Sequence, residues 1–311
     1  MRQSVLDSAG IQAGRIEARW WVRFWVTSTV TVLVLAALAW AIIRSRRGSA
    51  PPADDRRLLR HIAGATAATV AILFGLLVTT IVTSRAIASQ YDRQALAIEV
   101  TANQWWWNVE YQHPEPEQRV RTANEIHIPV GRSVSIKLLA NDVIHSFWVP
   151  ALHGKLDAIP GHEAILSLRA DRPGTYRGQC AEYCGAQHAH MALLVVAESS
   201  DDFERWIQAQ RTTAAPPQSD LEQRGLDLVQ RSACVMCHTI RGTAAGGRMG
   251  PDLTHLASRS TILAVTAPRT VENLHRLIAD PHQFKPGSRM PALGLAAEDR
   301  AAIVAYLERL K

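Results

Sequence analysis

The chain has 311 residues, which is too long for one small domain and suits two compact units with further segments. Its hydrophobic fraction of 47% is ordinary for a soluble protein, but two long uncharged stretches lie near the N-terminus. The formal net charge is +6, yet no basic stripe alternates with aromatic residues, so we expect no nucleic-acid partner. Composition therefore indicates a membrane protein with several domains.

Two segments have the length of membrane-spanning helices. Residues 24–43 and 62–84 run for 20 and 23 residues without a charge, and about 20 apolar residues are needed to cross the hydrocarbon core of a bilayer. A cleaved signal peptide is the alternative for the first segment, but its apolar run is long and no small-residue cleavage site follows it. We predict a tail over residues 1–23 and a transmembrane hairpin over residues 24–90.

The connection between the two spans is strongly basic. Its only acids are Asp54 and Asp55, and its arginines are Arg44, Arg46, Arg47, Arg56, Arg57 and Arg60. Short loops rich in arginine stay in the cytoplasm. The N-terminal tail also contains arginines, so the connection differs from the tail only in having more arginines over a shorter stretch of sequence. We expect both ends of the chain to lie outside the cytoplasm.

The region after the hairpin changes pattern twice. Residues 91–200 contain short apolar stretches separated by turn residues, which predicts a β-sandwich; the clearest stretches are 126–131, 134–139, 165–168 and 192–196. Residues 201–219 read as a short helix followed by a linker that is too polar and proline-rich to pack. Residues 220–311 have helical periodicity and predict an all-α domain, with helices near 221–230, 271–279 and 296–310.

Charge differs between the two outer domains. Residues 91–200 carry 9 basic and 12 acidic side chains, whereas residues 220–311 carry 12 basic and 9 acidic side chains. Opposite net charges favour orientation and fast encounter more than affinity. We therefore expect the two domains to dock on each other.

Residues 180–191 carry a dense group of soft metal ligands, CAEYCGAQHAHM. Two thiolates, an imidazole and a thioether on one loop favour copper, and a weak thioether ligand is typical of electron-transfer copper proteins. A mononuclear blue site needs one cysteine, whereas two cysteines four residues apart could bridge two copper ions. A zinc site is the alternative, but it leaves Met191 without a role.

A second histidine ligand must then come from outside this loop. His145, at a predicted strand end, is the best candidate. The competing histidines are His113, His127, His153, His162 and His190. From spacing alone, the choice among them stays open.

Residues 234–238 read CVMCH, which is an attachment site for c-type haem. Cys234 and Cys237 would bond to the haem vinyl groups and His238 would bind the iron. The four cysteines could instead form two disulfides outside the cytoplasm, but all four lie in these two motifs. We expect the carbonyl of Pro251 to bond to the second nitrogen of His238.

A final helix follows the segment KPGSRMP at residues 285–291, and Met290 is our candidate for the sixth iron ligand. A thioether opposite histidine raises the haem potential into the range of an electron donor. Met249 is the rival thioether. A second histidine ligand is the other alternative, although we expect its three candidates to lie at the surface: His255, His275 and His282.

Residues 24–197 resemble cytochrome c oxidase subunit II of the dinuclear copper (CuA) type. The resemblance rests on QWWW at residues 104–107, NDVIHSFWVP at 141–150, KLDAIPG at 155–161, and the loop at 180–191. Residues 221–311 resemble a class I cytochrome c. The resemblance implies a multidomain membrane protein: a two-helix transmembrane hairpin, a cupredoxin-like β-sandwich and an all-α cytochrome c domain.

The resemblance also implies roles for individual residues. It makes Cys180 and Cys184 bridging thiolates, His145 and His188 terminal ligands, and Met191 the weak thioether. Glu182 would bind copper through its backbone carbonyl and reach a magnesium ion at the boundary with subunit I through its side chain. Trp105 would be the residue where electrons enter; the alternative is that the tryptophans at 105–107 are sandwich core.

The sequence departs from the family pattern in two places. A glutamate expected at the start of the second helix, on a proton path, is absent, and Asp54 and Asp55 are the nearest acids. An asparagine is often found shortly after the segment at 155–161, where this chain has His162, Glu163 and Ala164.

The resemblance implies the subunit through which electrons enter a proton-translocating haem-copper terminal oxidase. Electrons would pass from a cytochrome c-type donor through haem c to the copper pair, and then to subunit I, where oxygen is reduced. Subunit I, subunit III and lipid would be partners, in a bacterial inner membrane with both outer domains on the periplasmic side. No catalytic residue is expected on this chain. The alternative is a membrane-tethered redox carrier or copper-delivery protein without a catalytic partner.

Overall fold

The computed structural model describes residues 1–46, 48, 54–88 and 95–311. These residues form two units, Gly14–Gln90 and a larger one that joins Met1–Ala13 to Tyr91–Lys311. The boundary predicted at residues 90 and 91, and Arg47 of the basic connection, lie outside the described residues.

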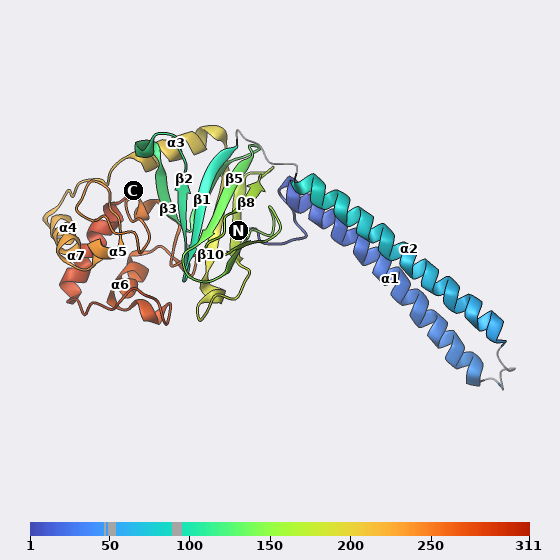
Figure 1. Cartoon of the computed structure of the whole chain (residues 1–311). Helices are drawn as coiled ribbons and strands as arrows, with labels where there is room; N and C mark the ends of the chain where they lie inside the picture. Colours follow the sequence, from blue (N-terminus) through green and yellow to red (C-terminus); the bar gives the residue numbers. More distant parts are fainter. Residues whose placement is uncertain (47, 49–53, 89–94) are drawn as a thin grey trace. The chain divides into compact units, whose positions relative to one another are not determined.

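The smaller unit is a pair of long helices, α1 (Ile11–Arg46) and α2 (Asp55–Ala88), which lie side by side (Figure 1). By length and composition, both are long and apolar enough to cross a membrane. Both helices extend beyond the spans predicted at residues 24–43 and 62–84. At one end of the pair, Arg23 donates to Thr80 Oγ1 at 2.9 Å, and Arg19 contacts Thr83.

The larger unit contains a sandwich of two five-stranded sheets (Figure 1). The order in the first sheet is β3 (Val120–Ala123), β2 (Trp106–Tyr111), β1 (Leu96–Asn103), β5 (Val134–Ala140) and β8 (Ala164–Leu168). The order in the second is β4 (Glu125–Pro129), β10 (Ala192–Glu198), β9 (Gly174–Cys180), β6 (His145–Trp148) and β7 (Leu156–Ala158).

Strand burial follows the sequence pattern. In β5, Val134, Ile136 and Leu138 are fully buried while the residues between them are half-buried, as expected for a strand with one face on the core. The strand β10 is buried over most of its length because it lies between β4 and β9. These alternating and continuous apolar stretches therefore produce the predicted sandwich.

The N-terminal segment forms an edge of this sandwich by pairing with β9, which the sequence did not indicate. The backbone N–H of Arg2 donates to Thr175 O at 2.9 Å, and Arg177 N–H donates to Arg2 O at 2.9 Å. Further along, Ala9 N–H donates to Ala151 O at 2.7 Å. The predicted tail over residues 1–23 is thus divided between this edge and the first turns of α1.

The C-terminal region is helical. Its helices are α3 (Ser200–Arg211), α4 (Asp220–Arg231), α5 (Cys234–Cys237), α6 (Val271–Ala279) and α7 (Ala297–Arg309), with a short pair of strands, β11 (Thr261–Ile262) and β12 (Ala267–Pro268). The 3₁₀ turns are η1 (Pro116–Gln118), η2 (His188–His190), η3 (Leu256–Ser258) and η4 (Pro281–Gln283). Together with the hairpin and the sandwich, these helices confirm the predicted fold class.

The expectation that residues 212–219 do not pack is wrong in part. Ala214 packs against the core of the C-terminal domain, and its N–H donates to Arg241 O at 2.9 Å. Thr212 O lies 3.1 Å from His255 Nε2. The segment packs because its backbone polar groups find partners on a distant loop, which local composition does not reveal.

Candidate metal and haem sites

The soft ligands of residues 180–191 and His145 gather at one end of the second sheet. His145 begins β6 and Cys180 ends β9, and these two strands pair at Phe147 and Cys180. The loop after Cys180 then turns back, because Cys180 N–H donates to Met191 O at 2.8 Å. Strand pairing and loop closure together place residues that are 35 positions apart beside one another.

The donor atoms surround the two cysteine sulfurs. Sγ of Cys180 lies 3.8 Å from Sγ of Cys184 and 3.9 Å from His145 Nδ1. Sγ of Cys184 lies 3.6 Å from His188 Nδ1 and 3.9 Å from Met191 Sδ. The ligand atoms of His145, Cys180 and Cys184 are all within 4.8 Å of one another. This set of two sulfurs, two imidazoles and a thioether fits a copper site of soft ligands.

The outer side of His145 is held by Asp142, which sequence reasoning did not assign a role. His145 is fully buried, and its Nε2 lies 2.8 Å from Asp142 Oδ1, which leaves Nδ1 facing the sulfurs. Asp142 Oδ2 also accepts the backbone N–H of Gln104 at 2.7 Å. A carboxylate behind a ligating histidine fixes the orientation of its ring. The signal was available, because Asp142 lies within the segment NDVIHSFWVP.

The two cysteine thiols shift each other's pKa in opposite directions. The hydrogen bond with Cys184, helped by His145, lowers the pKa of Cys180 to about 3 in spite of burial. The same bond raises the pKa of Cys184. Burial alone would lower the pKa of His145, but its bonds to Cys180 and Asp142 raise it. These shifts favour the thiolate at Cys180 and the thiol at Cys184, and metal binding would release the remaining thiol proton.

Three of the other candidate histidines have partners elsewhere. His127 Nδ1 lies 2.9 Å from Glu198 Oε1, and its ring stacks on Trp206. His190 Nδ1 lies 2.8 Å from Gln187 Oε1, and His153 Nδ1 lies 3.0 Å from Gly154 O. The geometry thus favours His145 and His188 as the two imidazoles at the sulfurs.

Trp105 lies directly beside this cluster. Its Nε1–H donates to Cys184 O at 2.9 Å, and Gln104 Nε2–H donates to the same oxygen at 2.8 Å. Glu182, whose carbonyl oxygen lies 3.2 Å from Cys180 Sγ, keeps its side chain partly exposed beside Lys155. Of the three tryptophans, Trp107 is the sandwich core residue, since it is fully buried against Phe147.

The CVMCH segment forms a short helix followed by His238 in extended backbone. His238 Nδ1 lies 2.8 Å from Pro251 O, which confirms the predicted contact and leaves Nε2 free for iron. Burial lowers the pKa of His238, so the ring is neutral and can bind a metal. Gly250 packs so close that an added Cβ would lie 2.7 Å from Cε1 of this ring. The site therefore fits a haem bound at Cys234, Cys237 and His238.

The candidates for the sixth ligand differ in exposure. Met290 is half-buried, whereas Met249 is 71% exposed. His255 was expected at the surface, and this expectation is wrong: the residue is 2% exposed, with Nδ1 2.8 Å from Lys311 O and Nε2 3.1 Å from Thr212 O. Both of its nitrogens therefore face carbonyl oxygens. Its burial escaped sequence analysis because the partners lie 43 and 56 residues away.

Fold and sites together define a membrane-anchored redox protein in which a cupredoxin-like domain precedes a cytochrome c domain. The family model for the periplasmic domain of cytochrome c oxidase subunit II matches residues 96–198, and the model for cytochrome c matches residues 222–311. The chain belongs to the cytochrome c oxidase subunit 2 family, and it is a subunit of an oxidoreductase complex. Family membership implies copper and haem.

Three similar proteins illustrate the relationship. Cytochrome c oxidase subunit 2 of Alkalihalophilus pseudofirmus is 32% identical, over 99% of this chain and 91% of its own length. The subunit 2 of Bacillus subtilis is 31% identical, over 70% of this chain and 63% of its own. The crystal structure of the periplasmic domain of subunit II of cytochrome oxidase of Bradyrhizobium japonicum is 29% identical, with a TM-score of 0.35, over 37% of this chain and 93% of that one.

Proposed function

We propose that this chain is the subunit through which electrons enter a proton-translocating haem-copper terminal oxidase. When bound, haem c and the copper pair would supply one-electron redox chemistry, between a cytochrome c-type donor on one side and oxygen-reducing subunit I on the other. The chain's own residues would hold the two groups. This proposal divides the outer region into a copper domain, residues 91–200, and a cytochrome domain, residues 220–311.

One observation carries the proposal: the loop at residues 285–290 packs on Trp105. Lys285 Nζ donates to Trp105 O at 2.8 Å, and an added Cβ on Gly287 would lie 3.8 Å from the indole ring. The same loop ends at Met290, the proposed iron ligand, while Trp105 bonds to the carbonyl of Cys184, a proposed copper ligand. A short covalent and hydrogen-bonded route therefore joins the two proposed sites.

Further contacts hold this loop in place. Gln187 Nε2–H donates to Pro286 O at 2.8 Å, and Arg289 lies 3.8 Å from Asp142 Oδ2. Lys285 is only 4% exposed, and burial lowers its pKa to about 7. A buried lysine that bonds to a backbone carbonyl is costly to place, so its position supports a specific contact between the domains.

The finer assignments belong to the same proposal. Cys180 and Cys184 would bridge the copper ions, with His145, His188, Met191 and the carbonyl of Glu182 as the remaining ligands. The partly exposed carboxylate of Glu182 is the group available for magnesium at subunit I. The partners would be subunits I and III and a cytochrome c donor, in the bacterial inner membrane, with the two outer domains periplasmic.

Metal content tests the cofactors. The oxidase, purified with its partner subunits in mild detergent, should contain two copper ions per haem c iron in addition to the metals of the oxygen-reducing subunit. It should also show a low-energy absorption from mixed-valence copper. Zinc in place of copper, or one copper per iron, would contradict the dinuclear site. Migration of the chain without any haem-bearing partner would instead favour the tethered carrier.

Substitution of Trp105 tests the route. Trp105→Phe removes the bond to Cys184 O but keeps an aromatic ring, and it should slow electron transfer from the haem to copper in the purified oxidase. Trp106→Phe, on the neighbouring half-buried tryptophan, is the matched control and should leave this rate unchanged. Equal rates in the two variants would remove Trp105 from the path.

A further inference from the structure

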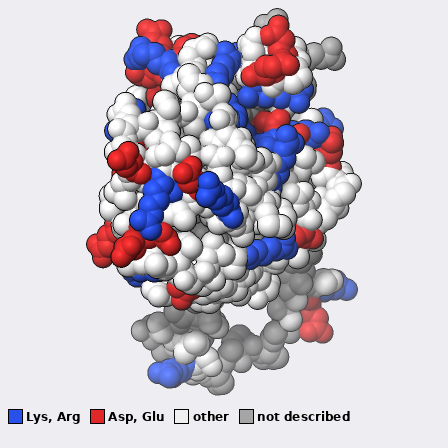
Figure 2. All heavy atoms as spheres, turned by 90° about the vertical axis from the view of Figure 1, so that its left-hand side faces the viewer, with Lys and Arg blue, Asp and Glu red and all other residues white. Residues whose placement is uncertain are grey.

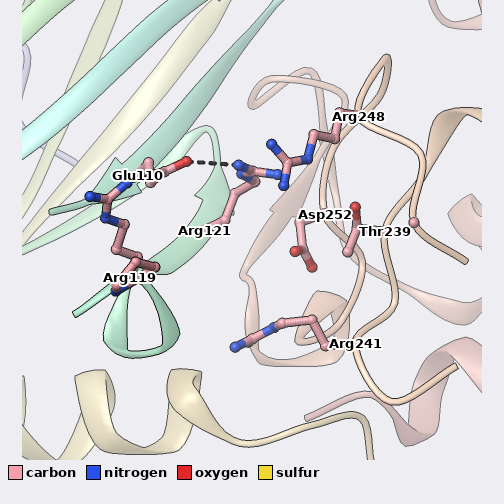
Figure 3. Close-up of a pocket in the computed structure, with 9 residues that line it drawn as sticks. Glu110, Arg119, Arg121, Thr239, Arg241, Arg248 and Asp252 are labelled. Carbon is pink, nitrogen blue, oxygen red and sulfur yellow. Dashed lines mark hydrogen bonds and ion pairs between the residues drawn. The ribbon is translucent and has the colours of Figure 1, made fainter. Parts of the chain in front are cut away.

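A cavity of about 420 Å³ lies between the copper domain and the cytochrome domain (Figure 3). Glu110, Arg119 and Arg121 line it from the copper domain, where Glu110 lies on β2 and Arg121 on β3. Arg241, Arg248 and Asp252 line it from a loop of the cytochrome domain. This cavity belongs to neither of the two sites described above.

The charges around this cavity do not balance. Glu110 is shared between two arginines: its carboxylate lies 2.8 Å from Arg121 and 4.0 Å from Arg119. Asp252 is the second acid, and four arginines face these two carboxylates. The lining therefore carries a net charge of about +2, since arginine stays protonated in proteins.

Like charges also approach each other across the domain boundary. Figure 3 shows the guanidinium groups of Arg121 and Arg248 pointing toward one another, although they come from different domains. Burial lowers the pKa of Arg241; the charge of Asp252 opposes this shift, and the charge of Arg121 adds to it by a smaller amount. Juxtaposed like charges oppose docking unless an anion lies between them.

Two donors in this lining lack partners. Among the described residues, the Nε atoms of Arg121 and Arg241 are buried and have no hydrogen-bond acceptor. A buried donor without an acceptor is destabilising, and more so when the group is charged. Both atoms belong to planar forks that match the oxygens of phosphate.

The cavity is also separate from the proposed iron ligand. Its wall includes Thr239 and Asp252, which adjoin His238 and Pro251 in sequence. The bond between His238 Nδ1 and Pro251 O lies on this side of the ring, whereas iron would take Nε2. The nitrogen that would bind iron is therefore not the one that bonds beside this wall.

We propose that this cavity binds a phosphate-type oxyanion that bridges the arginines of the two domains. A dianion would balance the lining charge and accept from both unpartnered Nε atoms. The volume falls within the range of about 300–1,000 Å³ typical of ligand pockets, so a free phosphate or the end of a polyphosphate chain would fit. Bound there, the anion stabilises contact between the copper and cytochrome domains.

Calorimetry tests the site by measuring the binding of inorganic phosphate to the purified oxidase. The ionic strength is kept constant, with chloride as the balancing anion. Wild type should bind one phosphate per chain and gain thermal stability with phosphate concentration. Arg248→Gln should weaken binding about ten-fold, as expected for the loss of a charge-assisted hydrogen bond. Because Arg248 is exposed on a loop, this variant should fold.

Arg231→Gln, at the exposed end of α4 and away from the cavity, is the matched control and should bind like wild type. Pyrophosphate and ATP, tested in the same way, distinguish free phosphate from a polyphosphate as the bound anion. Tighter binding of either one than of phosphate identifies a polyphosphate. Equal or weaker binding identifies free phosphate. Absence of saturable binding for all three anions, or equal affinity in wild type and Arg248→Gln, overturns the proposal.

Discussion

At the scale of single residues, Asp142 positions a proposed copper ligand without contacting the cysteine sulfurs. It holds His145 from behind and also accepts the backbone N–H of Gln104, next to Trp105. Asp142→Asn keeps the shape but removes the charge, and we expect it to weaken copper retention by about 10–100-fold, as for other partners of metal-ligating histidines. Copper competition with a chelator measures this.

The matched control for Asp142→Asn is Asp171→Asn, because Asp171 forms a more exposed ion pair with Arg169. That variant should retain copper like wild type. Unchanged retention in Asp142→Asn would mean that His145 is held by packing alone.

His153 gives a pH dependence of stability. Burial lowers its pKa below 6.5, only partly opposed by the bond to Gly154 O. The unfolded chain therefore binds a proton on this residue that the folded chain does not, so stability falls as pH drops through 6.5 toward the lowered pKa. His153→Gln should flatten this part of the curve, measured by denaturant unfolding between pH 7 and about pH 5. An identical slope in the variant would contradict the assignment.

Residues that act through neighbours in sequence could be predicted, and those that act across the fold could not. The loop at 180–191 holds five of the six proposed copper ligands, so spacing alone indicated a soft-metal site. Lys285, in contrast, bonds to a residue 180 positions away. Nothing in its local sequence distinguishes it from a surface lysine.

At the scale of elements, α4 and α7 pack at the closest approach that glycine permits. A Cβ added to Gly225 would lie 2.0 Å from Ala302 O, which is a backbone atom that cannot rotate away. Alanine is favoured over glycine in a helix by about 1 kcal/mol, but overpacking costs about 1–3 kcal/mol or more. Gly225→Ala should therefore lower the thermal midpoint of the cytochrome domain.

Gly246→Ala is the control for this prediction, because nothing lies within 4 Å of its added Cβ. Its thermal midpoint should match that of wild type. A Gly225→Ala protein as stable as this control would show that the two helices can separate at no cost.

Helix boundaries could be predicted because their signals are local. Ser219 and Thr270 cap α4 and α6 with side-chain bonds to the backbone, and both helices end within one residue of the predicted position. The edge formed by Arg2 and the packing of Ala214 depend on backbone bonds to distant strands and loops. Such contacts have no signature in composition or periodicity.

At the scale of the whole molecule, Glu125 joins the copper domain to the cytochrome domain. Its carboxylate accepts the N–H groups of Ser260 and Thr261 at 3.0 and 3.2 Å and the Ser260 hydroxyl at 2.8 Å. Hydrogen bonds to a charged group contribute about 1.5–3 kcal/mol. Glu125→Ala should therefore loosen the contact and slow haem-to-copper electron transfer by about ten-fold.

Rapid reduction of the haem, followed by the absorption of copper, measures this rate in the purified oxidase. Glu117→Ala, on an exposed acid of the same domain, should leave it unchanged. A Glu125→Ala rate equal to that of wild type would place the controlling contact elsewhere, with Lys285 as the next residue to replace.

The charges at the contact between the copper and cytochrome domains have mixed signs. Figure 2 shows acidic and basic side chains intermixed over one face of the molecule, the side where Figure 1 places α4 and α7. Across the domain contact, the pair of Arg289 and Asp142 has the expected signs, whereas Arg121 and Arg248 have the same sign. Domain docking thus depends on local bonds more than on overall charge.

The edge formed by Arg2 and Ala9 makes the larger unit a discontinuous domain, with both helices of the hairpin inserted between its first residues and the remainder. A chain that leaves a folded body and returns to it must cross a bilayer an even number of times. During synthesis, the first residues therefore cannot pair with the sandwich strands until both helices have crossed the bilayer. The first residues can reach these partners only if the hairpin returns to the side from which it left.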